Sequence, residues 1–181
     1  MAVIDVGAAV IGRASDTGGA YTYIDLDNPA NDTGIINSIE VWFATTGTNV
    51  KIGTFYGSGL NWTVRDYVTV ASIPSGSKQT ITSISIDVQT GDCIGFYSPS
   101  GNIEYDTSGG TGMLYVAGDK FGGGSNAYTA LAGDLCSLYG TGTTDIGWAN
   151  ITHLNGLVSA TISHVNGVAV AAISHVNGIA V

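Results

Sequence analysis

Almost no stretch of this sequence is suited to forming a helix. Glycine, β-branched residues, asparagine and aspartate recur so closely that few segments can sustain a 3.6-residue period. Glycine alone accounts for 27 of the 181 residues, about twice its usual share of roughly 7%. The regular structure of this chain must therefore come from strands.

Apolar and polar residues alternate in short runs, which is typical of strands with one side on a core. Ile39, Val41 and Phe43 share one face in this way. The pattern predicts strands at residues 21–26, 39–43, 50–56, 64–73, 84–88, 93–97, 113–116 and 135–139, separated by turn-forming residues such as Asp27-Asn28-Pro29. About nine short strands, with turns roughly every 8–12 residues, predict an all-β, jelly-roll-like antiparallel β-sandwich over residues 1–148.

Composition excludes several classes of protein. Charged residues make up 10% of the chain, and 5 Lys+Arg against 14 Asp+Glu leave a formal charge of −9. Nucleic-acid binding needs clustered basic residues, and a membrane span needs about 18 continuous apolar residues; the sequence predicts neither. Asp5 interrupts the first apolar stretch and Arg13 follows it, unlike a secretory signal. We therefore expect assembly in a cytoplasm.

The two cysteines, Cys93 and Cys136, cannot by themselves complete a tetrahedral zinc site. Their spacing matches no zinc motif. Reduced thiols in the core are the favoured interpretation, and a disulfide between them is the alternative.

The last part of the chain, residues 149–181, is a repeat with an 11-residue step. Each copy contains one histidine and one Asn-Gly pair. These positions are His153, Asn155, Gly156, His164, Asn166, Gly167, His175, Asn177 and Gly178. Asn-Gly is a strong signal for a two-residue hairpin, because both turn positions need positive φ. The sequence of residues 149–181, here called the tail, therefore predicts three hairpins in series.

These hairpins have no polar side to present to water. Val165 and Val168 fall on one face, and His164 with Ala169 on the other. A single hairpin is only marginally stable by itself. We therefore expect the tail to bury its faces against other subunits, as an intertwined homotrimer, or against a neighbouring protein.

The repeated Ile-Ser-His-Val-Asn-Gly-Val-Ala-Val of the tail resembles short arrays at the C-termini of bacteriophage structural proteins. The preceding part of the chain, residues 1–148, resembles jelly-roll modules of virion fibres and of carbohydrate-binding domains. That likeness rests on the phrases Val50-Lys-Ile-Gly-Thr-Phe-Tyr-Gly, Gly91-Asp-Cys-Ile-Gly-Phe-Tyr and Ile103-Glu-Tyr-Asp-Thr-Ser-Gly-Gly. The resemblance implies a virion component, such as a fibre, decoration or adsorption protein, that contacts itself and other virion proteins.

One segment predicts a ligand-binding surface. Tyr56 and Trp62 flank a glycine-containing loop, so their rings could stack on a sugar while Asn61 or Arg65 bonds its hydroxyls. The alternative is that Trp62 faces the core. In a regular strand, side chains two residues apart lie on the same face, and this places Trp62 with Val64, Val68 and Val70.

Candidates for catalysis are few. Glu104 and Asp106 would share one face of an alternating strand, and a pair of carboxylates can serve acid–base chemistry. The three histidines all lie in the tail, away from the sandwich. We therefore predict that the chain is not an enzyme.

Two metal sites are conceivable on residue type, and each has a structural alternative. Asp25, Asp27 and Asp32 supply the oxygen ligands that Ca²⁺ prefers, but Asp27 also begins a good turn. The histidine lattice could bind a transition metal if the tail is threefold, or could repeat simply because the unit was duplicated. We expect no cofactor. The sequence thus predicts a non-enzymatic virion protein, with a carbohydrate-binding module as the alternative.

Overall fold

The computed structural model describes residues 3–144 and, between residues 153 and 180, six strands of two residues each. The chain divides into two compact units, Ala2–Thr144 and Asp145–Val181 together with Met1. Each unit is described below by itself. In the described part of the chain, no helix is long and apolar enough to cross a membrane.

Fourteen strands make up the first unit, here called the body. They are β1 (Val3–Gly7), β2 (Ser15–Asp16), β3 (Tyr21–Asp25), β4 (Gly34–Trp42), β5 (Gly47–Ser58), β6 (Asn61–Ile73), β7 (Lys78–Val88), β8 (Cys93–Tyr97), β9 (Glu104–Asp106), β10 (Gly112–Ala117), β11 (Asn126–Ala127), β12 (Thr129–Ala132), β13 (Leu135–Cys136) and β14 (Leu138–Thr144).

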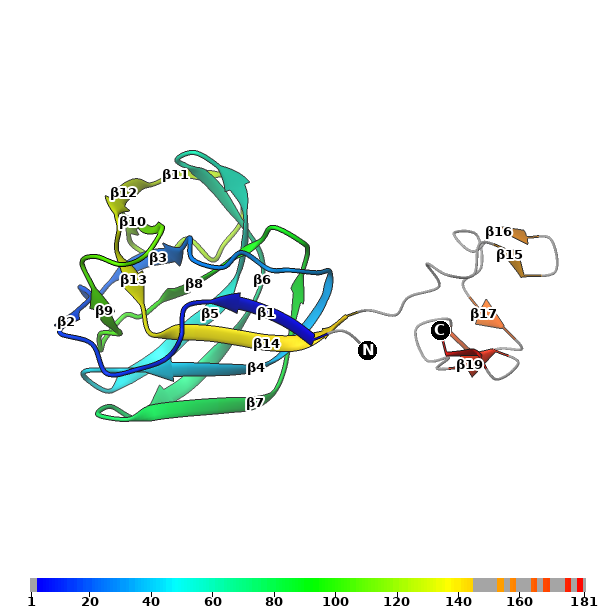
Figure 1. Cartoon of the computed structure of the whole chain (residues 1–181), viewed down its shortest axis with the longest axis horizontal. Helices are drawn as coiled ribbons and strands as arrows, with labels where there is room; N and C mark the ends of the chain where they lie inside the picture. Colours follow the sequence, from blue (N-terminus) through cyan, green and yellow to red (C-terminus); the bar gives the residue numbers. More distant parts are fainter. Residues whose placement is uncertain are drawn as a thin grey trace. The chain divides into compact units, whose positions relative to one another are not determined.

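The body is an antiparallel sandwich with the connectivity of a jelly roll (Figure 1). One sheet has the order β1-β14-β4-β7, and the other has the order β11-β6-β5-β8-β3-β10-β12. A small third sheet has the order β13-β9-β2; β9 and β13 lie between β8 and β14 in the chain, whereas β2 lies between β1 and β3. The eight principal strands change sheets in the jelly-roll sequence, since β1, β4, β7 and β14 form one layer and β3, β5, β6 and β8 the other. The predicted all-β sandwich is confirmed.

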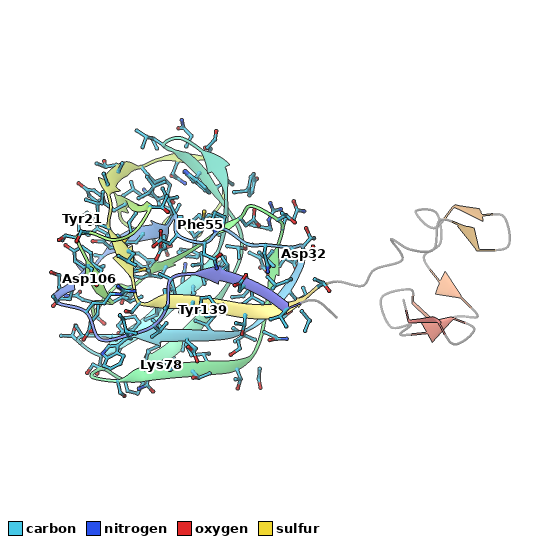
Figure 2. All side chains as sticks on the ribbon, in the orientation of Figure 1. Tyr21, Asp32, Phe55, Lys78, Asp106 and Tyr139 are labelled. Atoms are coloured by element: carbon cyan, nitrogen blue, oxygen red, sulfur yellow. The ribbon has the colours of Figure 1, made fainter. Side chains whose placement is uncertain are left out.

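Two hydrophobic clusters lie on the opposite faces of the seven-stranded sheet. The inner cluster fills the sandwich with residues such as Ile4, Ile39, Ile52 and Phe96. Alternate residues of the same strands turn outward and are covered by the segment around residues 121–128. That outer cluster contains Ile24, Phe55, Trp62, Cys93, Leu114, Phe121 and Tyr128. Figure 2 shows Phe55 within the body. Its ring packs edge-on against that of Phe121, with 5.1 Å between the ring centres. Burying each such ring contributes about 1.5–3 kcal/mol.

Strand β1 was not among the strands expected from the sequence. It pairs with β14 from Val3 opposite Thr143 to Gly7 opposite Tyr139. The strand ends at Gly7, whose φ of +91° suits glycine, and a Cβ there would lie 2.4 Å from the carbonyl oxygen of Leu138. The N-terminal stretch is therefore an edge strand of the four-stranded sheet.

Six strands of the tail form three separate two-stranded antiparallel sheets. They are β15 (His153–Leu154), β16 (Leu157–Val158), β17 (His164–Val165), β18 (Val168–Ala169), β19 (His175–Val176) and β20 (Ile179–Ala180). Each pair flanks one Asn-Gly dipeptide, with Leu154 opposite Leu157 and Val165 opposite Val168. The predicted hairpin pairing is confirmed for these strands. The Asn-Gly residues, and the side chains of the three histidines, lie outside the described residues.

Candidate functional site

The turn end of the β5–β6 hairpin brings one aromatic and three polar residues to the same face. Tyr56 pairs with Thr63, and Ser58 pairs with Asn61 across the two-residue turn. Directly opposed residues of an antiparallel pair share a face, as do residues two apart on one strand. Tyr56, Ser58, Asn61 and Thr63 therefore line one side of the hairpin, which we call the hairpin face.

A β-bulge at Arg65 decides which residues join this face. Thr54 is opposite Asp66 and Phe55 is opposite Val64, so Arg65 is an extra residue in β6. A bulge of this kind shifts the alternation of side chains by one position. Beyond it, the odd and even residues of β6 exchange faces.

The parity argument that grouped Trp62 with Val68 and Val70 is therefore wrong. Trp62 belongs to the outer cluster, with Val64 packed against that cluster. Val68 and Val70 pack against the inner cluster. The two pairs face opposite sides of the sheet because the bulge lies between them.

Trp62 is not available as a stacking ring. Only 7% of the residue is exposed, and its Nε1 donates a hydrogen bond to the carbonyl of Gly59 at 3.0 Å. The prediction that Trp62 binds a ligand is wrong, and its alternative assignment to the core is correct. The ring fills space behind the hairpin and holds its turn in place.

Arg65 lies against Tyr56 and is fixed by Asp92. The guanidinium donates to both carboxylate oxygens of Asp92, with Nη2 to Oδ1 at 3.0 Å and a second, shorter bond from Nε to Oδ2. Asp92 is 3% exposed and also accepts the backbone N–H of Gln89 at 2.9 Å. The guanidinium carbon lies 4.7 Å from the centre of the Tyr56 ring, a cation–π distance. The hydrogen bonds to Asp92 raise the pKa of Arg65, so it stays charged.

Tyr56 is the exposed aromatic of this group. The residue is 45% exposed, although the guanidinium lies over its ring. Of the residues predicted from the sequence to bind a ligand, the structure brings Tyr56, Asn61 and Arg65 to one end of the hairpin. It adds Ser58 and Thr63, which the sequence argument missed although the Ser58-Gly59 turn implies their pairing.

The two carboxylates of β9 are both bound by the N-terminal segment. The backbone N–H of Arg13 donates to Oε2 of Glu104 at 2.6 Å, and its Nη1 donates to Oδ2 of Asp106 at 2.8 Å. The Arg13 side chain is only 4% exposed, and its Nε also donates to Ser137. The Arg13 hydrogen bond lowers the pKa of Asp106. These contacts tie the segment after β1 to the small sheet, a partnership that no local signal in the sequence revealed.

Asp25 is a buried carboxylate in the inner part of the sandwich. It is 1% exposed, and its Oδ1 accepts the backbone N–H of Asp27 at 2.9 Å. Its Oδ2 accepts the backbone N–H of Cys136 at 3.1 Å and lies 3.3 Å from the Cys136 thiol. Burial raises the pKa of Asp25 to about 6.

The other acidic residues near Asp25 have different partners. Asp27 accepts the backbone N–H of Thr111 at 2.5 Å, and Asp32 accepts that of Thr33 at 2.8 Å. Over the described residues, no three His, Cys, Asp or Glu side chains are grouped as ligands of a metal ion. The three carboxylates considered as Ca²⁺ ligands accept hydrogen bonds from backbone N–H groups of turns and strands, which fits the alternative structural role that the sequence offered for them. The histidines considered as ligands of a transition metal have side chains outside the described residues.

Both cysteines are buried free thiols, as the favoured interpretation predicts. They lie in different clusters, Cys93 in the outer one and Cys136 in the inner one. Burial raises the pKa of Cys93 to about 12 and that of Cys136 well above its ordinary value. Neither is suited to act as a thiolate.

The sequence was compared with protein-family models and with curated proteins. No family model matches the chain, and no curated protein matches it significantly.

Proposed function

We propose that this chain is a non-enzymatic structural protein of a bacteriophage particle, a fibre, decoration or adsorption component. Its tail joins subunits into a homo-oligomer, with a trimer favoured, or docks them on neighbouring virion proteins. Its body is the displayed part. The resemblance of the tail and body sequences to phage structural proteins supports the virion assignment.

The pairing of the tail strands carries the proposal. Each of the three hairpins has two residue pairs, and each forms a two-stranded sheet of its own. A two-stranded hairpin needs further strands or a packing partner to be stable in water. Apolar residues such as Leu154, Val165 and Val168 occupy these short strands. Covering them requires surface that a second polypeptide can supply.

The body supports a structural role because its reactive groups hold the fold together. Glu104 and Asp106 bind the Arg13 segment, and Asp92 binds Arg65. Both thiols are buried with raised pKa values. These contacts use the side chains that acid–base or nucleophilic catalysis would need free.

Light scattering on the full chain, coupled to size-exclusion chromatography, tests the assembly. We expect a mass near three times the chain's 18.4 kDa. Truncation after Ala149, or the double substitution Val165→Asp and Val168→Asp, should reduce it to a single chain. The matched control is Ile11→Asp, which changes an isoleucine of the body that is 54% exposed and should leave the mass unaltered.

An oligomer that survives loss of the tail refutes the assembly role. Mass spectrometry of purified phage particles tests the virion assignment separately, because a structural component is present there in fixed stoichiometry. Its absence from particles would refute that part while leaving the measured oligomer unaffected.

A further inference from the structure

We propose that the hairpin face is a binding site for an uncharged carbohydrate, with Tyr56 as the ring on which a sugar stacks. The proposal goes beyond the assembly role of the tail, and it assigns the displayed body a ligand class. Four features of the described residues support it.

The first feature is that the Tyr56 ring is held in place before any ligand arrives. Arg65 lies over the ring at 4.7 Å, and Asp92 holds Arg65 by two hydrogen bonds. Asp92 is itself buried at 3% exposure in the turn that follows β7. A side chain fixed in this way loses little conformational entropy on binding, which favours affinity. The 45% exposure of Tyr56 leaves ring surface for the C–H groups of a pyranose.

The second feature is a set of uncommitted polar side chains beside the ring. Ser58, Asn61 and Thr63 share the face with Tyr56. Across the described body, none of their side chains hydrogen-bonds to another residue, whereas buried hydroxyls such as that of Thr54 do. Two hydroxyls and an amide offer both donors and acceptors, which matches the hydroxyl groups of a sugar.

The third feature is the rigidity of the hairpin itself. Trp62 fills the opposite side and donates to the Gly59 carbonyl at 3.0 Å. Strand β11 pairs with Asn61 and Trp62, and the backbone N–H of Tyr128 donates to Leu60 at 2.8 Å. Trp62 is thus a positioning residue, since it supports the face without contributing to it.

The fourth feature is electrostatic and selects the class of sugar. The charge of Arg65 is balanced by two bonds to Asp92, so little attraction remains for an acidic group. The chain as a whole carries −9, which repels polyanions at moderate ionic strength. Neutral hexose or N-acetylhexosamine units therefore fit this face better than sialylated or uronic-acid glycans.

Tyr67 provides a matched control on the same strand. It is 38% exposed and also has a cation near its ring, since Lys51 Nζ lies 5.3 Å from the ring centre. It lies beyond the bulge, on the outer face of the seven-stranded sheet, and its ring centre is 5.2 Å from that of Phe121. The two tyrosines thus match in exposure and in their cationic neighbour but belong to opposite faces.

The test applies the full chain to an array of neutral and acidic glycans, followed by calorimetry with the best monovalent oligosaccharide so that oligomerisation does not enhance binding. We expect binding to at least one neutral glycan. Tyr56→Ala should weaken it by at least about tenfold, and Asn61→Ala should weaken it measurably, while Tyr67→Ala should stay within about twofold. Far-ultraviolet circular dichroism checks that each variant is folded.

Three outcomes would overturn the proposal. They are the absence of binding to every neutral glycan, binding confined to acidic glycans, or equal losses in Tyr56→Ala and Tyr67→Ala. If the ligand is instead a protein that docks on the hairpin tip, glycans will not bind, and that result also rejects the proposal. The oligomeric mass measured for the same samples reports on the tail independently, so failure of one proposal is distinguishable from failure of the other.

Discussion

The ionisation of Asp25 should impose a distinctive pH dependence on the stability of the body. The carboxylate is 1% exposed, and its hydrogen bonds come from two backbone N–H groups and one thiol. Among the described residues, no lysine or arginine bonds to it. Desolvation, the dominant cause, raises its pKa to about 6, and the hydrogen bonds from Asp27 and Cys136 oppose this only in part.

The size and sign of the effect follow from linkage. An aspartate in the unfolded chain has a pKa of about 3.9, so folding shifts the Asp25 pKa by roughly 2 units, or about 3 kcal/mol. The folded state holds the proton more tightly than the unfolded state. The stabilisation is therefore fully present below about pH 4 and is lost as the pH rises through about 6.

The assay is urea denaturation of the wild type and of Asp25→Asn across pH 4 to 8. The amide has the shape of the carboxylate but does not ionise, so the wild type should lose about 2 kcal/mol relative to the variant over this range. The amide has only one acceptor oxygen, which lowers the variant's absolute stability by about 1–3 kcal/mol, so the test depends on the slope with pH.

The matched control is Asp87→Asn, an exposed aspartate of β7, whose profile should parallel that of the wild type. Identical pH profiles for the wild type and Asp25→Asn would refute the reasoning.

Three further predictions concern the fold. Ser83→Gly should raise the free energy of unfolding by roughly 0.5–1 kcal/mol in the same assay, because Ser83 has a φ of +60° that glycine adopts without strain; no gain would mean that Ser83 is not strained. Gly142→Ala should lower the free energy of unfolding by at least about 3 kcal/mol, because its Cβ would lie 2.0 Å from a backbone oxygen of β4. The control Gly122→Ala has open space around it and should change the stability little, so similar melting temperatures for the two variants would contradict the prediction. Cys93 and Cys136 should resist a thiol reagent at pH 8 until urea unfolds the chain, and rapid labelling of the native protein would show that their burial is incomplete.

Much of the sandwich is predictable because its signals are local. The alternation at 93–97 matches β8 (Cys93–Tyr97), and the hairpin signal of Asn166-Gly167 matches the pairing of Val165 with Val168. Side-chain period and turn chemistry depend on neighbouring residues, so a single sequence carries them. The strand at Glu104–Asp106 was also expected, but its role was not.

The candidate site was only partly predictable. Tyr56, Asn61 and Arg65 were identified by residue type, and the same reasoning wrongly added Trp62, which is buried. The argument from alternation placed Trp62 in the core correctly, but it put Trp62 on the same face as Val68 and Val70 because it assumed an unbroken strand. The bulge at Arg65 arises from the register between β5 and β6. Nothing in the local pattern of β6 announces which residue will be left unpaired.

The amino-acid order alone determined that this chain forms antiparallel strands, closes them with glycine- and asparagine-based turns, and ends in three like hairpins. Only the tertiary structure decided which side chains meet: Asp25 with Cys136, 111 residues away, and Arg13 with Asp106, 93 residues away. Strand formation depends on residues a few positions apart. Which side chains contact each other across a sandwich depends on the register and packing of whole sheets. The free energy that fixes this arrangement is shared among many contacts between residues far apart in the sequence.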